Sequence, residues 1–393
     1  MGSRSAPATR EPSIVSAAPA TGRARHSITA IFFVNGILIG CWASAIPQIK
    51  ERLALDEGPL GLALLCFAFG SIVAMLLGGP RIDRVGSRLV IAISAFGFCL
   101  SLPLVILAAS LPQLLAIASL IGFTNGLMDV AMNAQGITVE RQRGRPIMSS
   151  LHAFFSIGGM TGAGVAALTY ELGGGIQHFL IAVPLLVAPI AFFALQALLT
   201  DGQGRAAKTT LLALPPRALW LIAAFAFLAF VCEGAMFDWA AVYLREALLS
   251  EPGTAALGFG VFSAAMAAAR LCGDRVVARF GRVLVLRGSA TLALIGYTLA
   301  LSGGTVPPTL LGYALIGLGV ANIVPILFSL GGSQEGVGQG SGIAAVATAG
   351  YSGSLLGPAF VGFLADLSSL RWSLAVTACF LLLLVIFGGR VRR

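Results

Sequence analysis

Charged side chains are scarce in this sequence: Asp, Glu, Lys and Arg together make up 10% of its 393 residues, whereas 57% are hydrophobic. A soluble globular domain carries about 25% charged residues, so this composition excludes that class. Apolar runs long enough to cross a bilayer of about 30 Å recur along the chain, broken by short polar joints. The sequence therefore predicts a helical membrane protein that crosses the bilayer many times.

Paired cysteines and catalytic motifs are lacking as well. The chain contains no His-Glu-x-x-His and no Gly-x-Ser-x-Gly motif, which argues against an intramembrane enzyme. The six cysteines stand singly at apolar positions, without the spacing of a metal site or a disulfide framework: Cys41, Cys66, Cys99, Cys232, Cys272 and Cys379. We therefore expect no enzyme activity, no cofactor and no bound metal.

Basic residues gather at the ends of the apolar runs. Of the 25 Lys and Arg residues, 21 fall on the side of the termini and 4 on the opposite side. The positive-inside rule then predicts that both termini lie in the cytoplasm. The same distribution explains the net charge of +9 without a nucleic-acid partner. Twelve spans are expected near 28–48, 58–79, 89–109, 111–139, 147–170, 178–199, 218–243, 255–271, 283–302, 307–331, 340–364 and 371–389.

The chain divides near its middle into two expected bundles of six helices. Residues 1–27, rich in Ser, Ala, Pro and Arg, are expected to form a disordered cytoplasmic tail. The first bundle is expected at 28–200 and the second at 218–393, which ends in a short basic tail. The polar stretch 201–217 is the expected cytoplasmic linker between them.

A fixed offset of 195 residues relates the two halves at several positions. Arg84 and Gly86 correspond to Arg279 and Gly281 at this offset. Glycine matches alone mean little in a chain with 49 glycines, but the shared Arg-x-Gly spacing is more specific. The pattern favours parallel six-helix repeats, which one major transporter architecture uses.

The loop between spans 2 and 3 carries a recognisable motif, Gly-Pro-Arg-Ile-Asp-Arg-Val-Gly-Ser-Arg at 79–88. It resembles the signature G-x-x-x-D-R-x-G-R-R of the major facilitator superfamily, with Ser87 in place of the first Arg of the closing pair. The resemblance covers the chain after its tail and implies an all-α integral membrane fold of twelve transmembrane helices in two pseudo-symmetric six-helix bundles. Segments such as 125–136, 149–159 and 233–244 are similar to the bacterial branch that contains YbjJ and the membrane protein MosC.

The charges of this loop and of its counterpart in the second half form an expected cytoplasmic latch. Asp83 can accept hydrogen bonds from Arg side chains or from helix N-terminal amides, and Gly86 permits a tight turn. Such a latch would join the cytoplasmic ends of the two halves in one conformation and release them in the other. The alternative is ordinary positive-inside charge. The expected latch residues are Gly79, Asp83, Arg84, Gly86, Arg88, Asp274, Arg275 and Arg279.

Polar side chains inside the spans are few, which makes each a candidate for function. Asn125, Asp129 and Asn133 follow at steps of four in an apolar run, so they share one face of a helix. All four asparagines fall in spans 1, 4 and 10, and the resemblance implies that these spans and span 7 line a central cavity. Interhelical hydrogen bonding that only stabilises the bundle is the alternative. The expected cavity residues are Asn35, Trp42, Asn125, Asp129, Asn133, His152, Glu233 and Asn322.

Two intramembrane acids, Asp129 and Glu233, are the candidate proton carriers. A carboxylate in the lipid-buried region is costly, and such residues usually mark an ion or substrate path. Either acid can instead be a static hydrogen-bond partner of Asn125 or His152.

Three further residues have two interpretations each. His152 is a candidate proton relay or substrate ligand, or else a histidine packed against span 4. Trp42 can stack on a substrate ring or serve as an interfacial aromatic, and the second interpretation is slightly favoured. Asp238 is expected nearer the periplasmic mouth, as an interfacial residue or a gate.

No Lys or Arg is expected in the middle of a span, because Arg270 and Arg287 are near enough to the cytoplasmic ends to snorkel. A phosphate or dicarboxylate would ordinarily need a buried guanidinium. We therefore expect a secondary transporter that moves a sugar, polyol or amino-polyol by alternating access, coupled to protons. A multidrug or metabolite efflux carrier and a non-transporting membrane sensor are the alternatives. The expected partners are the lipid bilayer, a small solute and protons, with a monomeric chain.

Overall fold

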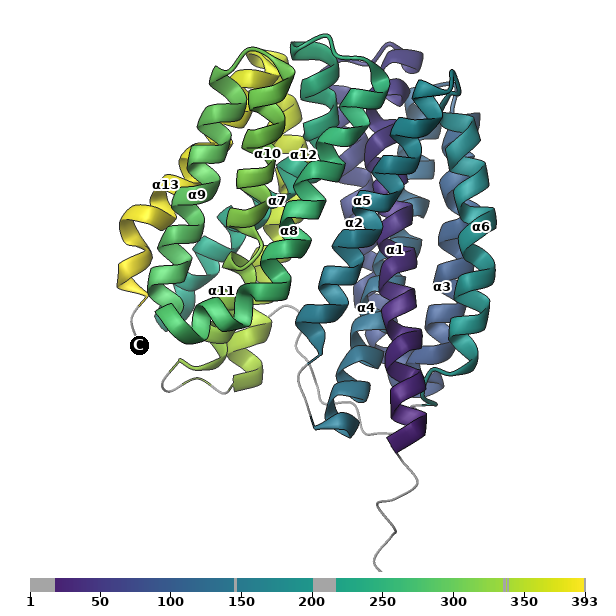
Figure 1. Cartoon of the computed structure of the whole chain (residues 1–393), viewed down its shortest axis with the longest axis vertical. Helices are drawn as coiled ribbons and strands as arrows, with labels where there is room; N and C mark the ends of the chain where they lie inside the picture. The colour runs from purple at the N-terminus through teal and green to yellow at the C-terminus, as the bar shows by residue number, and fades with distance from the viewer. Residues whose placement is uncertain (1–17, 145–146, 201–216, 335–336, 338, 392–393) are drawn as a thin grey trace, which may run out of the picture.

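The computed structural model describes residues 18–144, 147–200, 217–334, 337 and 339–391, and it is built of long helices that run side by side (Figure 1). A 3-10 segment, Leu102–Leu107, extends α3. The helices are α1 (Ala18–Leu53), α2 (Glu57–Val85), α3 (Ser87–Ser101), α4 (Leu111–Arg143), α5 (Met148–Glu171), α6 (Ile176–Gln196), α7 (Trp220–Ala247), α8 (Pro252–Phe280), α9 (Arg282–Ser302), α10 (Val306–Val320), α11 (Ile323–Gly332), α12 (Gln339–Leu367) and α13 (Leu370–Phe387).

Twelve helical units account for these elements. Eleven of them, within the described residues, are long and apolar enough to cross a membrane, with α10 and α11 forming one unit over Val306–Gly332. The remaining unit, α12, has 29 residues rich in Gly, Ala and Ser, and it packs against α2 and α7 inside the bundle. The fold class predicted from the sequence is confirmed.

The first helix begins earlier than the sequence predicted. It starts at Ala18, so residues 18–27 belong to α1 and not to a disordered tail. Ala and Arg are good helix formers, and the Thr29 hydroxyl donates to the Arg25 carbonyl at 2.8 Å within this first part of the helix. The rest of the expected tail, 1–17, and the expected linker, 201–216, lie outside the described residues.

The helices form two groups, α1–α6 and α7–α13, which lie on opposite sides of the molecule (Figure 1). The turns between α2 and α3 and between α8 and α9 have the same geometry, because Gly86 and Gly281 have φ angles of 85° and 78°. These glycines are 195 residues apart in the sequence. The backbone therefore agrees with the repeat offset, and the positive φ explains why glycine stands at both turns.

Within the first half, α1 and α5 approach each other closely. A Cβ atom added to Gly36 would collide with the Phe155 carbonyl, and one added to Gly158 would collide with the Phe33 carbonyl. Small residues allow helix backbones to approach in this way inside a membrane. The contact fixes α5, which also packs against α8 of the second half.

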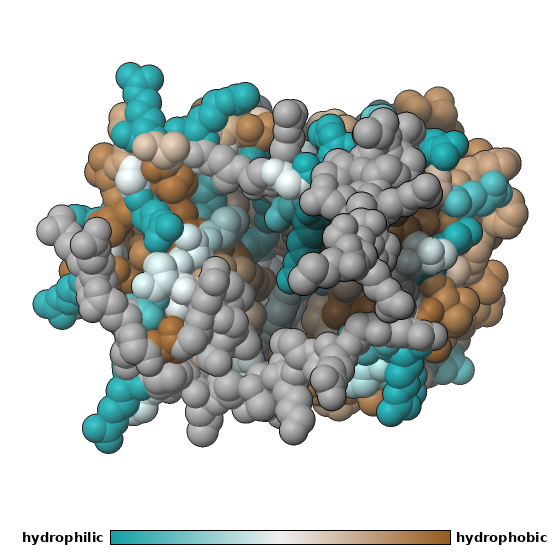
Figure 2. Space-filling model, turned by 90° about the horizontal axis from the view of Figure 1, so that it is seen from below, coloured by the Kyte–Doolittle hydropathy of each residue, from teal (hydrophilic) through white to brown (hydrophobic). Residues whose placement is uncertain are grey.

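The two halves meet unevenly along their length. We call the end where α1 begins and α13 finishes the terminal end, and the opposite end the far end. At the far end, α2 lies so close to α12 that a Cβ on Gly61 would stand 3.1 Å from the Gly362 Cα. At the terminal end the surface is hollowed between the halves, with hydrophilic residues beside the hollow (Figure 2).

Candidate functional site

A cavity of about 230 Å³ lies between the two halves. It is bounded by α1, α2, α4 and α5 of the first half and by α7 and α12 of the second. Most of its wall is apolar or aromatic, as is usual for small-molecule sites, and a few polar groups face the space. These polar lining residues are Asn35, Trp42, Ser71, Asn125, Asp129, Glu233, Asp238, Tyr351 and Ser354.

The polar face of α4 contributes one side of the cavity. Asn35 Nδ2 on α1 donates to Asn125 Oδ1 at 3.2 Å, which joins the two helices at the cavity wall. One turn further along α4, the Asp129 carboxylate accepts a hydrogen bond of 3.2 Å from Asn133 Nδ2. Asn133 itself is not among the residues lining the cavity. The predicted stripe therefore places Asn125 and Asp129 in the site and uses Asn133 to hold the acid.

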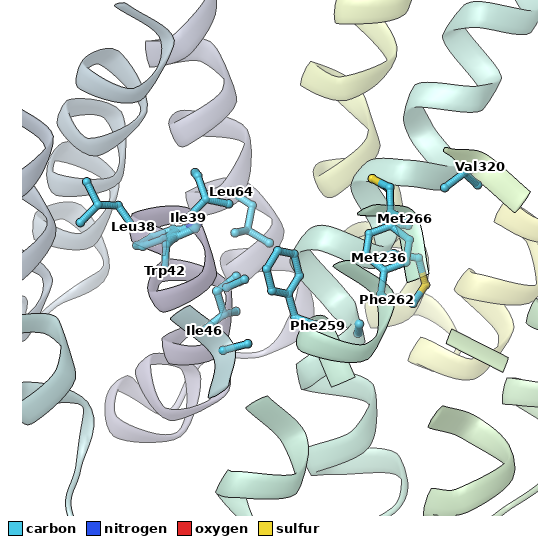
Figure 3. Close-up of a cluster of buried hydrophobic side chains, with 14 of the residues drawn as sticks. Leu38, Ile39, Trp42, Ile46, Leu64, Met236, Phe259, Phe262, Met266 and Val320 are labelled. Carbon is cyan, nitrogen blue, oxygen red and sulfur yellow. The ribbon is translucent and has the colours of Figure 1, made fainter. Parts of the chain in front are cut away.

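Trp42 forms part of an aromatic wall on α1 and α2. Its ring stacks on Phe67 with centroids 5.3 Å apart and an interplanar angle of 13°. It lies with Ile39 and Leu64 on the first-half side, and Phe259 of α8 stands opposite (Figure 3). The residue is 4% exposed, and its Nε1 donor has no hydrogen-bond partner. A buried donor without a partner among the described residues is costly, and packing alone does not explain it.

Glu233 is paired, which the sequence did not predict. Arg270 Nη2 on α8 donates to Glu233 Oε1 at 3.2 Å, and Arg270 Nη1 donates to Ser156 Oγ at 3.1 Å. The side chains of Arg270 and Glu233 are 15% and 13% exposed. Ser156 belongs to α5, so the guanidinium bridges the two halves. The expectation that Arg270 snorkels to the cytoplasmic end is wrong, because a carboxylate and a hydroxyl inside the bundle satisfy its donors.

Two other expected cavity residues lie outside the lining. The His152 ring packs edge-on against Phe32 with centroids 5.3 Å apart. Asn322 stands at the break between α10 and α11, where its Nδ2 is 3.5 Å from the Ala269 carbonyl oxygen. The lining includes no described residue of α10 or α11, and α2 and α12 take the place that the sequence assigned to span 10.

The sequence analysis did not assign several of the lining residues to the cavity. Asp238 was expected at the mouth, but it lines the cavity together with Glu233 on α7. Tyr351 and Ser354 reach the same space from α12, and Tyr351 lies within electrostatic range of Asp129. Asp238 had a usable signal, namely a second acid in an apolar run. Tyr351 had no such signal in the sequence, because a single tyrosine in a Gly-rich helix is typical of a residue that packs between helices.

Ion pairs tie the halves together at the far end. Lys50 Nζ on α1 lies 2.6 Å from Glu246 Oε1 on α7 and 3.5 Å from Glu57 Oε1 on α2. Arg245 Nε on α7 donates to Glu51 Oε1 on α1 at 2.5 Å. Two of these three pairs cross between the halves. The sequence offered a signal, since Lys50 and Arg245 are two of the four basic residues expected on that side and each adjoins an acid.

Comparison with known proteins agrees with this geometry. The family model described as Major Facilitator Superfamily matches residues 28–334. The chain belongs to this family. An uncharacterized MFS-type transporter of Yersinia pestis is 38% identical over 92% of this chain and 94% of that protein. The membrane protein MosC of Rhizobium meliloti is 33% identical over 86% of this chain and 84% of its own length.

Solved structures show the same fold at low identity. The crystal structure of the nucleoside transporter NupG superposes with a TM-score of 0.73 over 93% of this chain and 98% of that one. The sequences are 15% identical, so the likeness shows the fold alone. This member of the Major Facilitator Superfamily is thus a transporter of the secondary kind by family and architecture.

The expected latch residues lie at the terminal end, along α2, α3 and α8. Among the described side chains, Asp83 takes part in none of the four ion pairs. Arg279 lies over the ring of Phe280, 5.4 Å from its centroid. Ser87, the departure from the family signature, is buried and donates to Gln135 Oε1 on α4 at 2.5 Å. The latch stays a prediction.

Proposed function

We propose that this transporter moves a small polar solute of the sugar, polyol or amino-polyol type by alternating access. One observation carries the proposal: a cavity with a few polar groups lies between the halves, while the halves are held together at one end and separated by a hollow at the other. Rocking of two bundles about such a central site is how parallel-repeat transporters work.

The terminal end faces the cytoplasm in this proposal. Of the 25 basic residues, 21 are assigned to that side by the span order, and the positive-inside rule orients the chain accordingly. This conformation is then open to the cytoplasm and closed to the outside. The membrane is the inner membrane of a bacterial cell.

Asp129 is the proposed proton carrier. Its carboxylate lines the cavity, and its hydrogen bonds come from Asn133, a neutral amide on the same helix. Glu233 is already neutralised by Arg270, so it exchanges a proton only after that pair opens. Coupling follows if protonation of Asp129 stabilises one of the two conformations more than the other.

Efflux of amphipathic molecules is a second candidate, and the cavity wall favours it in part. Phe67, Phe155, Phe230 and Phe237 line the space together with Trp42. A purely polar lining would have argued against efflux, whereas this wall offers both rings and polar groups. Direction of transport is the quantity that separates the two candidates.

The proposal is tested with purified protein in proteoliposomes that carry an imposed pH gradient. Uptake of radiolabelled polyols and amino-polyols is measured for the wild type, Asp129→Asn and the control Asp56→Asn. Asp56 is exposed at the N-cap of α2, where Asn is an equally good cap. We expect gradient-accelerated uptake that Asp129→Asn loses and Asp56→Asn keeps. Flux no greater than in empty liposomes would favour the sensor alternative.

A further inference from the structure

The cavity has an excess of negative charge. Its lining contains three carboxylates, Asp129, Glu233 and Asp238, and no Lys or Arg among the described residues that bound it. Arg270 offsets Glu233 from behind the wall. Asp129 has a neutral amide as its partner, and Asp238 makes no hydrogen bond or ion pair with any described group. Two carboxyl groups thus face one low-dielectric space without a counter-charge, so their ionised forms are costly unless a cation or a proton compensates them.

A second observation points to a ligand in the same space. Trp42 is buried and lines the cavity, yet its Nε1 donor is unpartnered. The rings of Phe67, Phe230 and Phe237 belong to the same wall. Aromatic faces attract cations, with about 0.5–2 kcal/mol per contact. The cavity therefore offers both carboxyl groups and aromatic rings to a cation.

We infer that the transported solute is an organic cation, a protonated amine that the carboxyl groups of Asp129 on α4 and Asp238 on α7 attract into the cavity. This inference rests on the proposed function and selects the amine-bearing members of its substrate class. Because α4 and α7 belong to opposite halves, the attraction comes from both sides of the cavity.

The buried guanidinium does not turn the cavity into an anion site. Arg270 already donates to Glu233 and to Ser156. A substrate carboxylate could take Arg270 only by leaving Glu233 charged and unpaired, and it would face Asp129 and Asp238 without a counter-charge. Neutral sugars avoid this repulsion, but they bring no charge, so each acid would have to take up a proton to be compensated. A protonated amine supplies the positive charge that Asp129 and Asp238 lack in the cavity.

The first test measures the sign of the cavity potential without needing the natural substrate. Ser354→Cys places a thiol on the cavity wall, with the native Cys66, Cys272 and Cys379 replaced by Ser. Its reaction rates with methanethiosulfonates that carry trimethylammonium or sulfonate are compared, each relative to a free thiol. We expect the cationic reagent to be favoured by about 10-fold or more. Asp129→Asn with Asp238→Asn should reduce this preference several-fold, whereas Asp56→Asn should leave it unchanged.

The second test uses protection of the same thiol by two matched solutes. N-Methylglucamine and sorbitol share the hexitol skeleton and differ in the charged amine. Protection by N-methylglucamine, absent with sorbitol and lost in the Asp129→Asn and Asp238→Asn variants, supports the inference. Equal protection by both solutes, or a sulfonate reagent that reacts as fast as the cationic one, overturns it.

These outcomes separate the inference from the proposed function. Suppose that sorbitol shows gradient-driven flux in proteoliposomes and the cavity thiol shows no preference for the cationic reagent. The transporter proposal would then stand, and the inference of a cationic solute would fall. If N-methylglucamine protects the thiol but shows no flux, the cavity binds an amine as inferred, and the proposed transport of that amine is contradicted.

Discussion

The two ends of the molecule use charge in opposite ways. At the far end, Lys50 and Arg245 are engaged with acids of neighbouring helices, and two of the contacts cross between the halves. At the terminal end, Asp83 stands in the last turn of α2 among arginines, and it takes part in none of the ion pairs between described side chains. Ion pairs therefore join the two halves at the far end, whereas Asp83 at the terminal end has no ion-pair partner among the described residues.

This difference explains why the observed conformation is closed at the far end and hollowed at the terminal end. The far end combines the ion pairs with the backbone contact between Gly61 and Gly362, so its closure has both a charged and a packing component. The terminal end is hollowed between the halves (Figure 2), and Asp83 at this end makes no ion pair with a described residue. Alternating access requires the two ends to exchange these roles, so a variant that alters one end should shift the balance between them.

The largest effect is expected between the two ends, at the pair of Arg270 and Glu233. Arg270→Met leaves a buried carboxylate unpaired and removes the donor to Ser156, which should lower the free energy of unfolding by about 3–5 kcal/mol. Adding Glu233→Gln should restore most of the loss. Thermal unfolding of the purified protein measures both, with Arg287→Met, at an exposed arginine that donates to the Val385 carbonyl, as the control. A double variant as unstable as the single one would contradict the pairing.

This pair also marks the limit of what the sequence could predict. Apolar runs of about 20 residues predict helices because a helix satisfies all its backbone hydrogen bonds within one segment, so the spans follow from the order of apolar and polar residues. The glycine turns at Gly86 and Gly281 follow from their shared spacing. Asn125 and Asp129 follow from helical periodicity along one stretch of sequence. All of these features are local or repeat at a fixed offset.

What failed depends on which helices face each other. Arg270 was interpreted by its distance from a helix end, but its position is decided by Glu233 on the neighbouring helix. Asn322 was placed in the cavity because span 10 was expected there, whereas α2 and α12 form that wall. Lys50 and Glu246 are 196 residues apart and meet only after the halves assemble. Contacts between distant helices have no periodic signal in a single sequence.

The next largest effect is expected from overpacking the far end. Gly362→Val would push a side chain into the Glu57 carbonyl and the Gly61 Cα, which already lie 2.7 and 2.8 Å from an added Cβ. Overpacking costs about 1–3 kcal/mol, which the halves can relieve by separating at this end. Spin labels at Asp56→Cys and Leu367→Cys, on opposite halves, should report a longer distance. Gly164→Val, where an added Cβ meets nothing within 4 Å, should leave the distance unchanged.

A smaller effect is expected from the charged component of the same closure. Lys50 is 10% exposed at its side chain and serves two acids, so Lys50→Met should weaken closure by about 1–2 kcal/mol. The same pair of spin labels should show part of the population at the longer distance. Adding Glu246→Gln removes one of the two acids left unpaired and should return some of that population. No change in either variant would assign far-end closure to packing alone.

The smallest effect on this conformation is expected at the terminal end. Asp83→Asn removes a charge that has no ion-pair partner among the described side chains, so thermal stability should change by less than about 0.5 kcal/mol. The same variant should still slow transport, because a latch that joins the terminal ends forms only after the far end opens. Proteoliposome uptake measures this, with Asp56→Asn as the matched control on the other side of the membrane. If uptake by Asp83→Asn equals that of the wild type, the charges of this segment only orient the protein, and closure of the terminal end must rest on packing.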